Sequence, residues 1–265
     1  MTSFAARFRL DGKVALVVGG GSGIGRAAAR AMGDLGATVL CADINDANAA
    51  AVVKSITEAG GRCEQLEMDI TQTESVRSGV EAACKKHGRL DVLVSTPAVN
   101  VRKRLLTYTE DEFDKVIGLN LKGNFRLLRE VGRSMSEFGS GSIIILSSIR
   151  SLVVEPGQGV YAATKAALVQ LVRGFAVELA PKGVRVNAVA PGVVDTPLTA
   201  PIKANKDWYE AYAKRNALGR WAHEDELGCP IAFLASEASS YITGTVLFVD
   251  GGWTAIDGRY EPPLS

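Results

Sequence analysis

Tyr161 and Lys165 lie four positions apart in a stretch with helical periodicity. Residues one helical turn apart share a face, so we expect the ammonium group to lie near the edge of the phenol. A nearby cation favours phenolate and lowers the pKa of a tyrosine from its ordinary value of about 10. The pair therefore predicts a general acid or base. A solvated Tyr-Lys pair on a helix surface is the competing interpretation.

Ser147 and Ser148 directly follow the apolar run 143–146. If that run is a strand of a parallel sheet, the two hydroxyls stand at its carboxyl edge, where such sheets bind ligands. A serine at the end of a strand can also cap a turn. We therefore expect one of these hydroxyls to join the predicted acid or base.

A glycine-rich string, with Gly19, Gly23 and Gly25, separates an apolar run at 14–18 from a helical pattern at 23–35. Glycines allow a tight turn and a close backbone approach to a pyrophosphate, and a helix start adds free N–H donors and a positive dipole end. A flexible turn packed on the sheet would explain the glycines alone. The position between strand and helix favours a dinucleotide site.

Asp43 ends the second apolar run, about 20 residues after the glycines, where a carboxylate accepts hydrogen bonds from ribose hydroxyls and repels a 2′-phosphate. Ile44 follows it, and Ser22 stands before Gly23, so neither position is basic. These residues predict NAD rather than NADP as cofactor. The alternative is that Asp43 caps the turn near Asn45.

Asp69 and Ile70 stand at the end of the third apolar run. We expect them to flank the adenine. A capping role for Asp69 before Thr71 explains that residue equally well.

The elements that must position these residues alternate along the chain. Strands are expected at 14–18, 38–42, 62–67, 90–94, 142–146, 184–189 and 245–249. Helices are expected at 23–35, 46–58, 73–87, about 110–135 and 160–179. Apolar strands separated by helices predict an α/β fold, a single-domain, doubly wound, Rossmann-like parallel sheet of seven strands with helices on both faces.

Two further segments are set apart by composition. Proline and tryptophan interrupt 197–223, and we expect this excursion over the sheet edge to form a substrate lid, with its aromatic residues facing substrate or packing among themselves. The end of the chain, 257–265, is predicted to be a C-terminal tail.

Composition narrows the classes of protein. The 265 residues are 47% hydrophobic and 22% charged with a formal net charge of +1, which excludes disordered and collagen-like chains and gives no overall field for nucleic acid or an anionic membrane. No apolar run approaches the roughly 18 residues of a membrane span, and the first residues lack a signal-peptide core, so we expect a cytoplasmic protein. Four dispersed cysteines and two histidines predict neither disulfides nor a metal site.

Several motifs occur together in a familiar order. They are Gly-x-x-x-Gly-x-Gly at Gly19, Gly23 and Gly25, Asn120 in Leu119-Asn-Leu-Lys-Gly123, Ser148, Tyr161-Ala-Ala-Thr-Lys165, and Pro191-Gly192. From about residue 10 to 252 the chain resembles a short-chain dehydrogenase/reductase.

The resemblance implies a catalytic tetrad and a set of cofactor contacts. Tyr161 would be the acid/base, Lys165 would lower its pKa and hold the nicotinamide ribose, Ser148 would bond the reacting carbonyl or alcohol, and Asn120 would anchor a water of the proton relay. Spacing within the family pattern selects Ser148, with Ser147 as the fallback. The cofactor contacts implied beside those above are Ile24 over the pyrophosphate turn and Pro191, Gly192, Val194 and Thr196 toward the carboxamide.

The resemblance also implies a homotetramer, with contacts from the helices around Asn120 and Tyr161 and from 241–253. Two positions depart from the family pattern: Val18 replaces the usual threonine, and Ser95-Thr96-Pro97-Ala98 replaces Asn-Asn-Ala-Gly. We expect NAD to bind with an altered contact to the adenosine ribose.

Basic residues after the strands suggest the substrate. Arg102 and Arg150 would suit a carboxylate, and Arg102 to Arg104 resemble the gluconate dehydrogenase branch, although solvated surface charge explains most of these residues. The sequence predicts an NAD-dependent oxidoreductase of small secondary alcohols or ketones, with sugar acids and polyols among the expected substrates. The alternatives are an NADP-dependent carbonyl reductase and a catalytically silent nucleotide-binding protein with a regulatory or assembly role.

Overall fold

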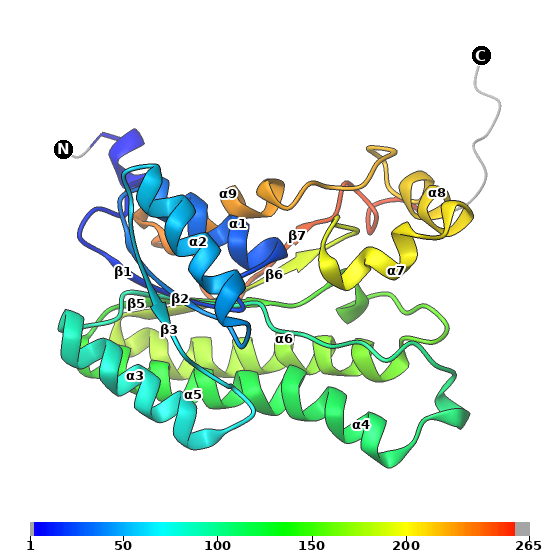
Figure 1. Cartoon of the computed structure of the whole chain (residues 1–265), viewed down its shortest axis with the longest axis horizontal. Coiled ribbons are helices and arrows are strands. Elements are labelled where there is room, and N and C mark those ends of the chain that lie inside the picture. The colour runs from blue at the N-terminus through cyan, green and yellow to red at the C-terminus, as the bar shows by residue number, and fades with distance from the viewer. Residues whose placement is uncertain (1–2, 258–265) are drawn as a thin grey trace.

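Seven parallel strands form one sheet in the computed structural model, which describes residues 3–257. The strand order is β3-β2-β1-β4-β5-β6-β7 (Figure 1). The strands are β1 (Val14–Val18), β2 (Thr38–Ala42), β3 (Arg62–Leu66), β4 (Val92–Ser95), β5 (Gly141–Leu146), β6 (Val184–Pro191) and β7 (Val246–Val249). The predicted seven-stranded, Rossmann-like sheet is confirmed.

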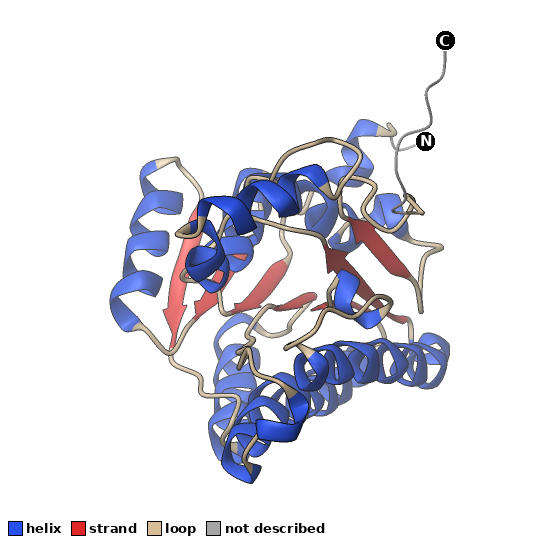
Figure 2. Ribbon diagram, turned by 90° about the vertical axis from the view of Figure 1, so that its right-hand side faces the viewer, coloured by secondary structure: helices blue, strands red, loops and turns tan. Residues whose placement is uncertain are grey.

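Helices cover both faces of the sheet. The helices are α1 (Gly23–Asp34), α2 (Asp46–Glu58), α3 (Thr73–His87), α4 (Glu110–Ile117), α5 (Asn124–Phe138), α6 (Gly159–Leu179), α7 (Ala200–Lys203), α8 (Lys206–Lys214) and α9 (Asp225–Ala235). Helices α1, α2 and α9 pack their buried residues on one face, and α3, α5 and α6 on the other (Figure 1). Figure 2 shows the strands enclosed between layers of helices. Both β1 and β4 are enclosed on both sides and bury every side chain, which explains why all of β1 and the first three residues of β4 are apolar.

Strands β1 and β4 are neighbours in the sheet although they are not consecutive in the chain. The chain leaves β1 toward β2 on one side and leaves β4 toward β5 on the other. The loops that follow β1 and β4 therefore diverge and border a crevice at the carboxyl edge of the sheet. The glycine-rich loop lies on one side of this crevice.

The helix predicted over 110–135 is not continuous. It begins with a capping box between Thr109 and Glu112, and α4 then passes through one π-helical segment, Gly118–Gly123, into α5. A π segment inserts an extra residue per turn and turns the following side chains, and such segments are frequent at functional sites. Asn120 sits inside it and is fully buried.

The segment predicted as a lid is anchored by aromatic packing. Residues 197–223 include α7 and α8, and the rings of Tyr209 and Trp221 stack with centroids 5.0 Å apart. Tyr212 packs edge-on against Trp253, with centroids 5.5 Å apart. The aromatic residues of the segment thus form a small core of their own beside the sheet.

By length and composition alone, the stretch Gly159–Lys182 is apolar enough to cross a membrane. In this fold its residues Leu168, Val172 and Ala176 are buried in the core on one face of the sheet, so its apolar character has a structural cause. The tail predicted at 257–265 lies outside the described residues except for Asp257.

Candidate active site

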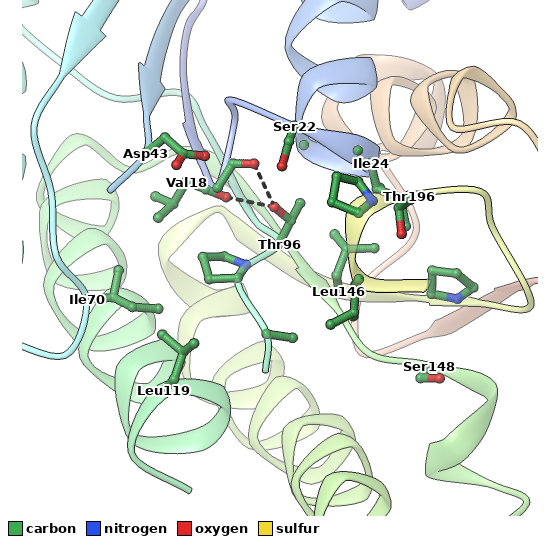
Figure 3. A pocket seen from close by; sticks show the side chains of 18 of the residues that line it. Val18, Ser22, Ile24, Asp43, Ile70, Thr96, Leu119, Leu146, Ser148 and Thr196 are labelled. Carbon is green, nitrogen blue, oxygen red and sulfur yellow. Dashed lines mark hydrogen bonds between the residues drawn. The ribbon is translucent and has the colours of Figure 1, made fainter. Parts of the chain in front are cut away.

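A cleft of about 460 Å³ runs along the carboxyl edge of the sheet between the loops after β1 and β4 (Figure 3). Asp43 and Ser148 lie toward its opposite ends. All residues predicted to bind the cofactor line it: Gly19, Ser22, Gly23, Ile24, Gly25, Asp43, Asp69, Ile70, Tyr161, Lys165, Pro191, Gly192, Val194 and Thr196. Asn120, Arg102 and Arg150 do not line it.

The glycine-rich loop has a shape that only glycines permit. Gly19 has a φ of +74°, and its N–H donates to the carbonyl of Ala42 over 2.8 Å. A Cβ added at Gly25 would lie 2.0 Å from the carbonyl oxygen of Gly19. The loop leads into α1, whose N-cap residue Ser22 makes no side-chain cap bond. The N–H groups at this helix start suit a pyrophosphate, so the loop fits a dinucleotide.

Asp43 holds this loop as well as lining the cleft. One carboxylate oxygen accepts from the N–H of Gly21 over 2.9 Å, and the other accepts from the N–H of Asn45 over 2.9 Å. Asp69 accepts from both the N–H and the hydroxyl of Thr71, which confirms its capping role. Both carboxylates therefore stabilise the backbone at the wall of the cleft by accepting hydrogen bonds from its N–H groups.

The candidate catalytic groups come from β5, its following turn and α6. The ammonium of Lys165 lies 5.5 Å from the centre of the Tyr161 ring and donates to the carbonyl of Leu146 over 2.7 Å. The hydroxyl of Ser148 accepts from the N–H of Arg150 over 3.1 Å and lies close enough to the Tyr161 phenol to lower the pKa of that phenol. Ser147 instead donates to the carbonyl of Lys165 over 2.9 Å, and so secures α6 to β5.

The expectation that Lys165 lowers the pKa of Tyr161 is wrong for this structure. Burial raises the pKa of Tyr161 to about 12, although Ser148 and the charges of Arg102 and Arg150 pull that pKa down. Burial also lowers the pKa of Lys165 to about 7. Both residues are enclosed, with 9% and 2% of their surfaces exposed, so the loss of hydration is the main cause of both pKa shifts.

Asn120 is tied to the backbone of Val99. Its side-chain oxygen accepts from the N–H of Val99 over 2.8 Å, and its amide donates to the Val99 carbonyl over 2.9 Å. The amide also lies 3.3 Å from the hydroxyl of Thr164, which itself donates to the carbonyl of Tyr161. Asn120 therefore connects the π segment, the chain after β4 and the helix that carries Tyr161.

The loop at 95–98 departs from the family pattern and holds the glycine loop in its own way. The hydroxyl of Thr96 lies 3.1 Å from the carbonyl oxygen of Val18 and 3.2 Å from that of Gly19 (Figure 3). The hydroxyl of Ser95 donates to Asn124. Thr96 thus supplies a side-chain bond across the β1/β4 crevice where Val18 has no hydroxyl.

Arg102 and Arg150 lie near the substrate end, close enough that their charges lower the pKa of Tyr161. Arg150 is 8% exposed and forms an ion pair with Glu155 over 2.5 Å. Arg102 stacks over Trp208, with its guanidinium carbon 5.3 Å from the ring centre. Lys103 pairs with Glu112 and Arg104 is exposed, as the surface-charge interpretation predicts.

No group of three or more His, Cys, Asp or Glu side chains placed to hold a metal ion occurs among residues 3–257.

A family model described as Enoyl-(Acyl carrier protein) reductase matches residues 19–254. The chain belongs to the short-chain dehydrogenase/reductase family. It is an oxidoreductase of this family, whose members use a nicotinamide cofactor and act on small molecules.

Its similarity to members of the short-chain dehydrogenase/reductase family covers nearly the whole chain. The 3-oxoacyl-[acyl-carrier-protein] reductase FabG of Thermotoga maritima is 39% identical over 246 residues, covering 92% of this chain and 98% of the relative. The 2-dehydro-3-deoxy-D-gluconate 5-dehydrogenase of Pseudoalteromonas atlantica is 35% identical, covering 93% and 98%. A gluconate 5-dehydrogenase structure from Burkholderia cenocepacia matches with a TM-score of 0.91 at 33% identity, covering 95% and 98%.

Sequence reasoning missed the residues that support the substrate end of this short-chain dehydrogenase/reductase. Glu155 accepts from Arg150, from Gln158 over 2.6 Å and from the hydroxyl of Tyr212. Burial and the Glu155 bond raise the pKa of Tyr212, which keeps its phenol a donor. Glu155 and Tyr212 are 57 residues apart, and no sequence spacing indicates their contact.

Proposed function

We propose that the protein is an NAD-dependent oxidoreductase that transfers hydride between nicotinamide and a small secondary alcohol or ketone. One observation carries this proposal: the glycine loop, Asp43 and the Ser148-Tyr161-Lys165 group all line the same cleft. A dinucleotide that spans the cleft would place one end at Asp43 and the other beside the Tyr161 phenol.

The chain's own residues supply binding, orientation and one proton. The bound dinucleotide would accept or deliver the hydride. Tyr161, protonated at neutral pH because burial raises its pKa to about 12, donates a proton to the carbonyl oxygen during reduction and becomes a phenolate. In the direction of oxidation the phenolate form of Tyr161 accepts the proton of the alcohol. Ser148 orients the same oxygen through its hydroxyl. In this proposal Asn120 would anchor a water of the proton relay and Lys165 would hold the nicotinamide ribose, the roles that the family implies for them.

Asp43 supports NAD as the cofactor. Its carboxylate stands at the end of β2, where it would meet the ribose hydroxyls and repel a 2′-phosphate, and Ile44 beside it is 82% exposed and carries no charge. The Burkholderia gluconate 5-dehydrogenase is described in complex with NADP and tartrate. A direct comparison of the two cofactors is therefore the first experiment.

The substrate range that we propose is sugar acids, polyols and related small alcohols. The Pseudoalteromonas relative is named for a deoxygluconate, and a relative from Sinomonas cyclohexanicum is named cis-4-hydroxycyclohexanecarboxylate dehydrogenase. Both names describe acids that carry a hydroxyl or carbonyl group. The charged residues near Tyr161 are compatible with such molecules.

The test combines binding and turnover. Binding of NADH and NADPH is followed by fluorescence, and oxidation of sugar acids, polyols and cyclic alcohols is followed by NADH absorbance, with the wild type and Tyr161→Phe. We expect wild-type turnover with NAD that disappears in Tyr161→Phe, while NADH still binds. NADH binding without turnover across the panel favours the catalytically silent nucleotide-binding protein, and turnover with NADP but not with NAD favours the carbonyl reductase.

We also propose a cytoplasmic homotetramer. Apolar side chains are exposed on α5, α6 and β7, including Phe125, Val177 and Phe248, and subunit contacts would cover them. Light scattering coupled to gel filtration measures the assembly, and a monomeric mass contradicts this proposal.

A further inference from the structure

Hydrogen bonds to other parts of the chain fix the backbone of residues 99–103, the segment that carries Arg102. Val99 is held at its N–H and its carbonyl by Asn120. The carbonyl of Val101 accepts from the hydroxyl of Tyr108 over 2.8 Å, and the N–H of Lys103 donates to the carbonyl of Gly157 over 3.0 Å. Arg102 therefore projects from a rigid strip of chain, as a residue that recognises a ligand must.

Arg102 has an incomplete set of hydrogen bonds. Its Nη1 atom is buried and has no hydrogen-bond partner, and no ion pair to Arg102 occurs within residues 3–257. Stacking on Trp208 fixes the plane of the guanidinium but satisfies none of its N–H donors. A buried charged donor without a partner is costly, so such an atom marks a place where a ligand completes the bonding.

Arg150 is in the opposite state. Its guanidinium is paired with Glu155, lies 3.4 Å from the hydroxyl of Tyr212 and stacks 5.5 Å from the ring centre of Trp253. Its charge is therefore already compensated inside the protein. Of the two arginines predicted to meet the substrate, Arg150 is in an ion pair, whereas Arg102 has a hydrogen-bond donor without a partner among the described residues.

The same strip carries an unpartnered acceptor. The side-chain oxygen of Asn100 is buried without a hydrogen bond, while its amide donates to Gln158 over 2.9 Å. A cationic donor and an acceptor that are both buried without partners, on residues two positions apart, suit a molecule that has both an anionic group and a hydroxyl. Because Arg150 is neutralised by Glu155, the uncompensated charge is a single one, which matches a carboxylate rather than a phosphate dianion.

We propose that Arg102 is the specificity-determining residue that binds the carboxylate of a hydroxy- or keto-acid substrate, while Arg150 only supports the wall of the site. This inference rests on the proposed function, since it assumes a substrate between the strip and Tyr161. It narrows the substrate class from small alcohols in general to small monocarboxylic acids with an oxidisable hydroxyl.

The experiment compares acids with their amides, which have the same shape but no charge. The NADH complex is titrated with D-gluconate and D-gluconamide, and with 3-hydroxybutyrate and its amide, by calorimetry, and kcat/KM is measured for each compound that turns over. The variants are Arg102→Met, which retains an apolar stem over Trp208, and Arg102→Lys, which retains the charge. Arg104→Met, two residues away and exposed, is the matched control for the loss of one positive charge.

We expect the wild type to bind at least one acid about tenfold or more tightly than its amide, as one charge-assisted hydrogen-bonded pair provides. Arg102→Met should abolish this preference, Arg102→Lys should restore part of it, and Arg104→Met should keep it. Equal affinities for acid and amide, no binding of either acid, or a preference that survives in Arg102→Met would overturn the inference.

The two proposals fail in different ways. Turnover of neutral alcohols that is unchanged in Arg102→Met leaves the proposed function standing and removes the carboxylate site. If acids bind in a way that depends on Arg102 but no compound turns over, the carboxylate site stands and the proposed oxidoreductase function is removed. Thermal unfolding of each variant confirms that it is folded before either conclusion is drawn.

Discussion

The ammonium of Lys165 lies 5.5 Å from the centre of the Tyr161 ring, yet it donates its hydrogen bond to the carbonyl of Leu146 and not to the phenol. Lys165 thus joins α6 to the end of β5 and is almost completely enclosed. Enclosure has a consequence for the charge of the ammonium, because burial lowers the pKa of Lys165 to about 7.

The first prediction concerns stability and pH. The pKa of Lys165 is about 7 when folded and 10.5 in its ordinary state, so between these values the unfolded chain binds more protons than the folded one. The free energy of unfolding should therefore rise with pH in this window, and the full penalty should remain below pH 7. Relative to Lys165→Met, we expect the wild type to gain about 1 kcal/mol or more between pH 7 and 9.

Urea denaturation followed by tryptophan fluorescence measures both proteins at each pH. Work above pH 10 is avoided, because the raised pKa of Tyr161 makes the folded state lose stability there. Parallel pH profiles for the two proteins would mean that Lys165 is not desolvated as the structure indicates.

The second prediction concerns Thr96. Its hydroxyl bonds the carbonyls of Val18 and Gly19, so Thr96→Val should loosen the glycine loop and weaken NADH binding about three- to tenfold, with a loss of about 1 kcal/mol in stability. Thr96→Ser keeps the hydroxyl and should bind NADH normally. Thr107→Val removes a similar bond, to Arg104, in an exposed turn outside the cleft, and should leave NADH affinity unchanged. Equal NADH affinity in Thr96→Val and the wild type contradicts the assignment.

Most of the fold could be predicted from the sequence because the central strands β1, β4 and β5 bury nearly all their side chains and therefore form short apolar runs. The proximity of Tyr161 and Lys165 could be predicted for a similar reason, because a spacing of four residues places both side chains on one helical face. These are local relations, in which neighbours along the chain decide the geometry.

What the sequence did not predict depends on contacts between distant segments. The π segment around Asn120 requires one extra residue in a turn, which no apolar periodicity reveals. The raised pKa of Tyr161 depends on how deeply the fold buries it. The different states of Arg102 and Arg150 depend on Glu155 and Tyr212, which fold against one arginine and not the other.

The third prediction tests the cofactor. We expect the wild type to prefer NAD over NADP by about tenfold or more, since a carboxylate a few ångströms from a phosphate costs between about 1 and 4 kcal/mol. Asp43→Asn should remove most of that preference, because the amide oxygen can still accept from the N–H of Gly21 while the charge is gone. Glu58→Gln, which also removes one negative charge but lies outside the cleft and is 67% exposed, is the control and should keep the preference. Fluorescence titrations measure the affinities for NADH and NADPH, and a wild-type preference for NADPH refutes the assignment of NAD.

The fourth prediction separates the two arginines through Glu155, which is 22% exposed and is the ion-pair partner of Arg150. Glu155→Gln leaves a buried guanidinium without its counter-charge, so we expect a loss of about 2–4 kcal/mol in urea denaturation. Glu112→Gln, at the more exposed pair with Lys103, should cost less than about 1 kcal/mol.

The same variant should bind carboxylates differently. With Glu155 neutral, Arg150 joins Arg102 as a second available cation near Tyr161, and a repelling anion is removed. Folded Glu155→Gln should therefore bind D-gluconate about three- to tenfold more tightly than the wild type while its affinity for D-gluconamide stays the same. Weaker gluconate binding would show that the Arg150–Glu155 pair is needed to hold the substrate wall in place, and would assign Arg150 a positioning role that outweighs its charge.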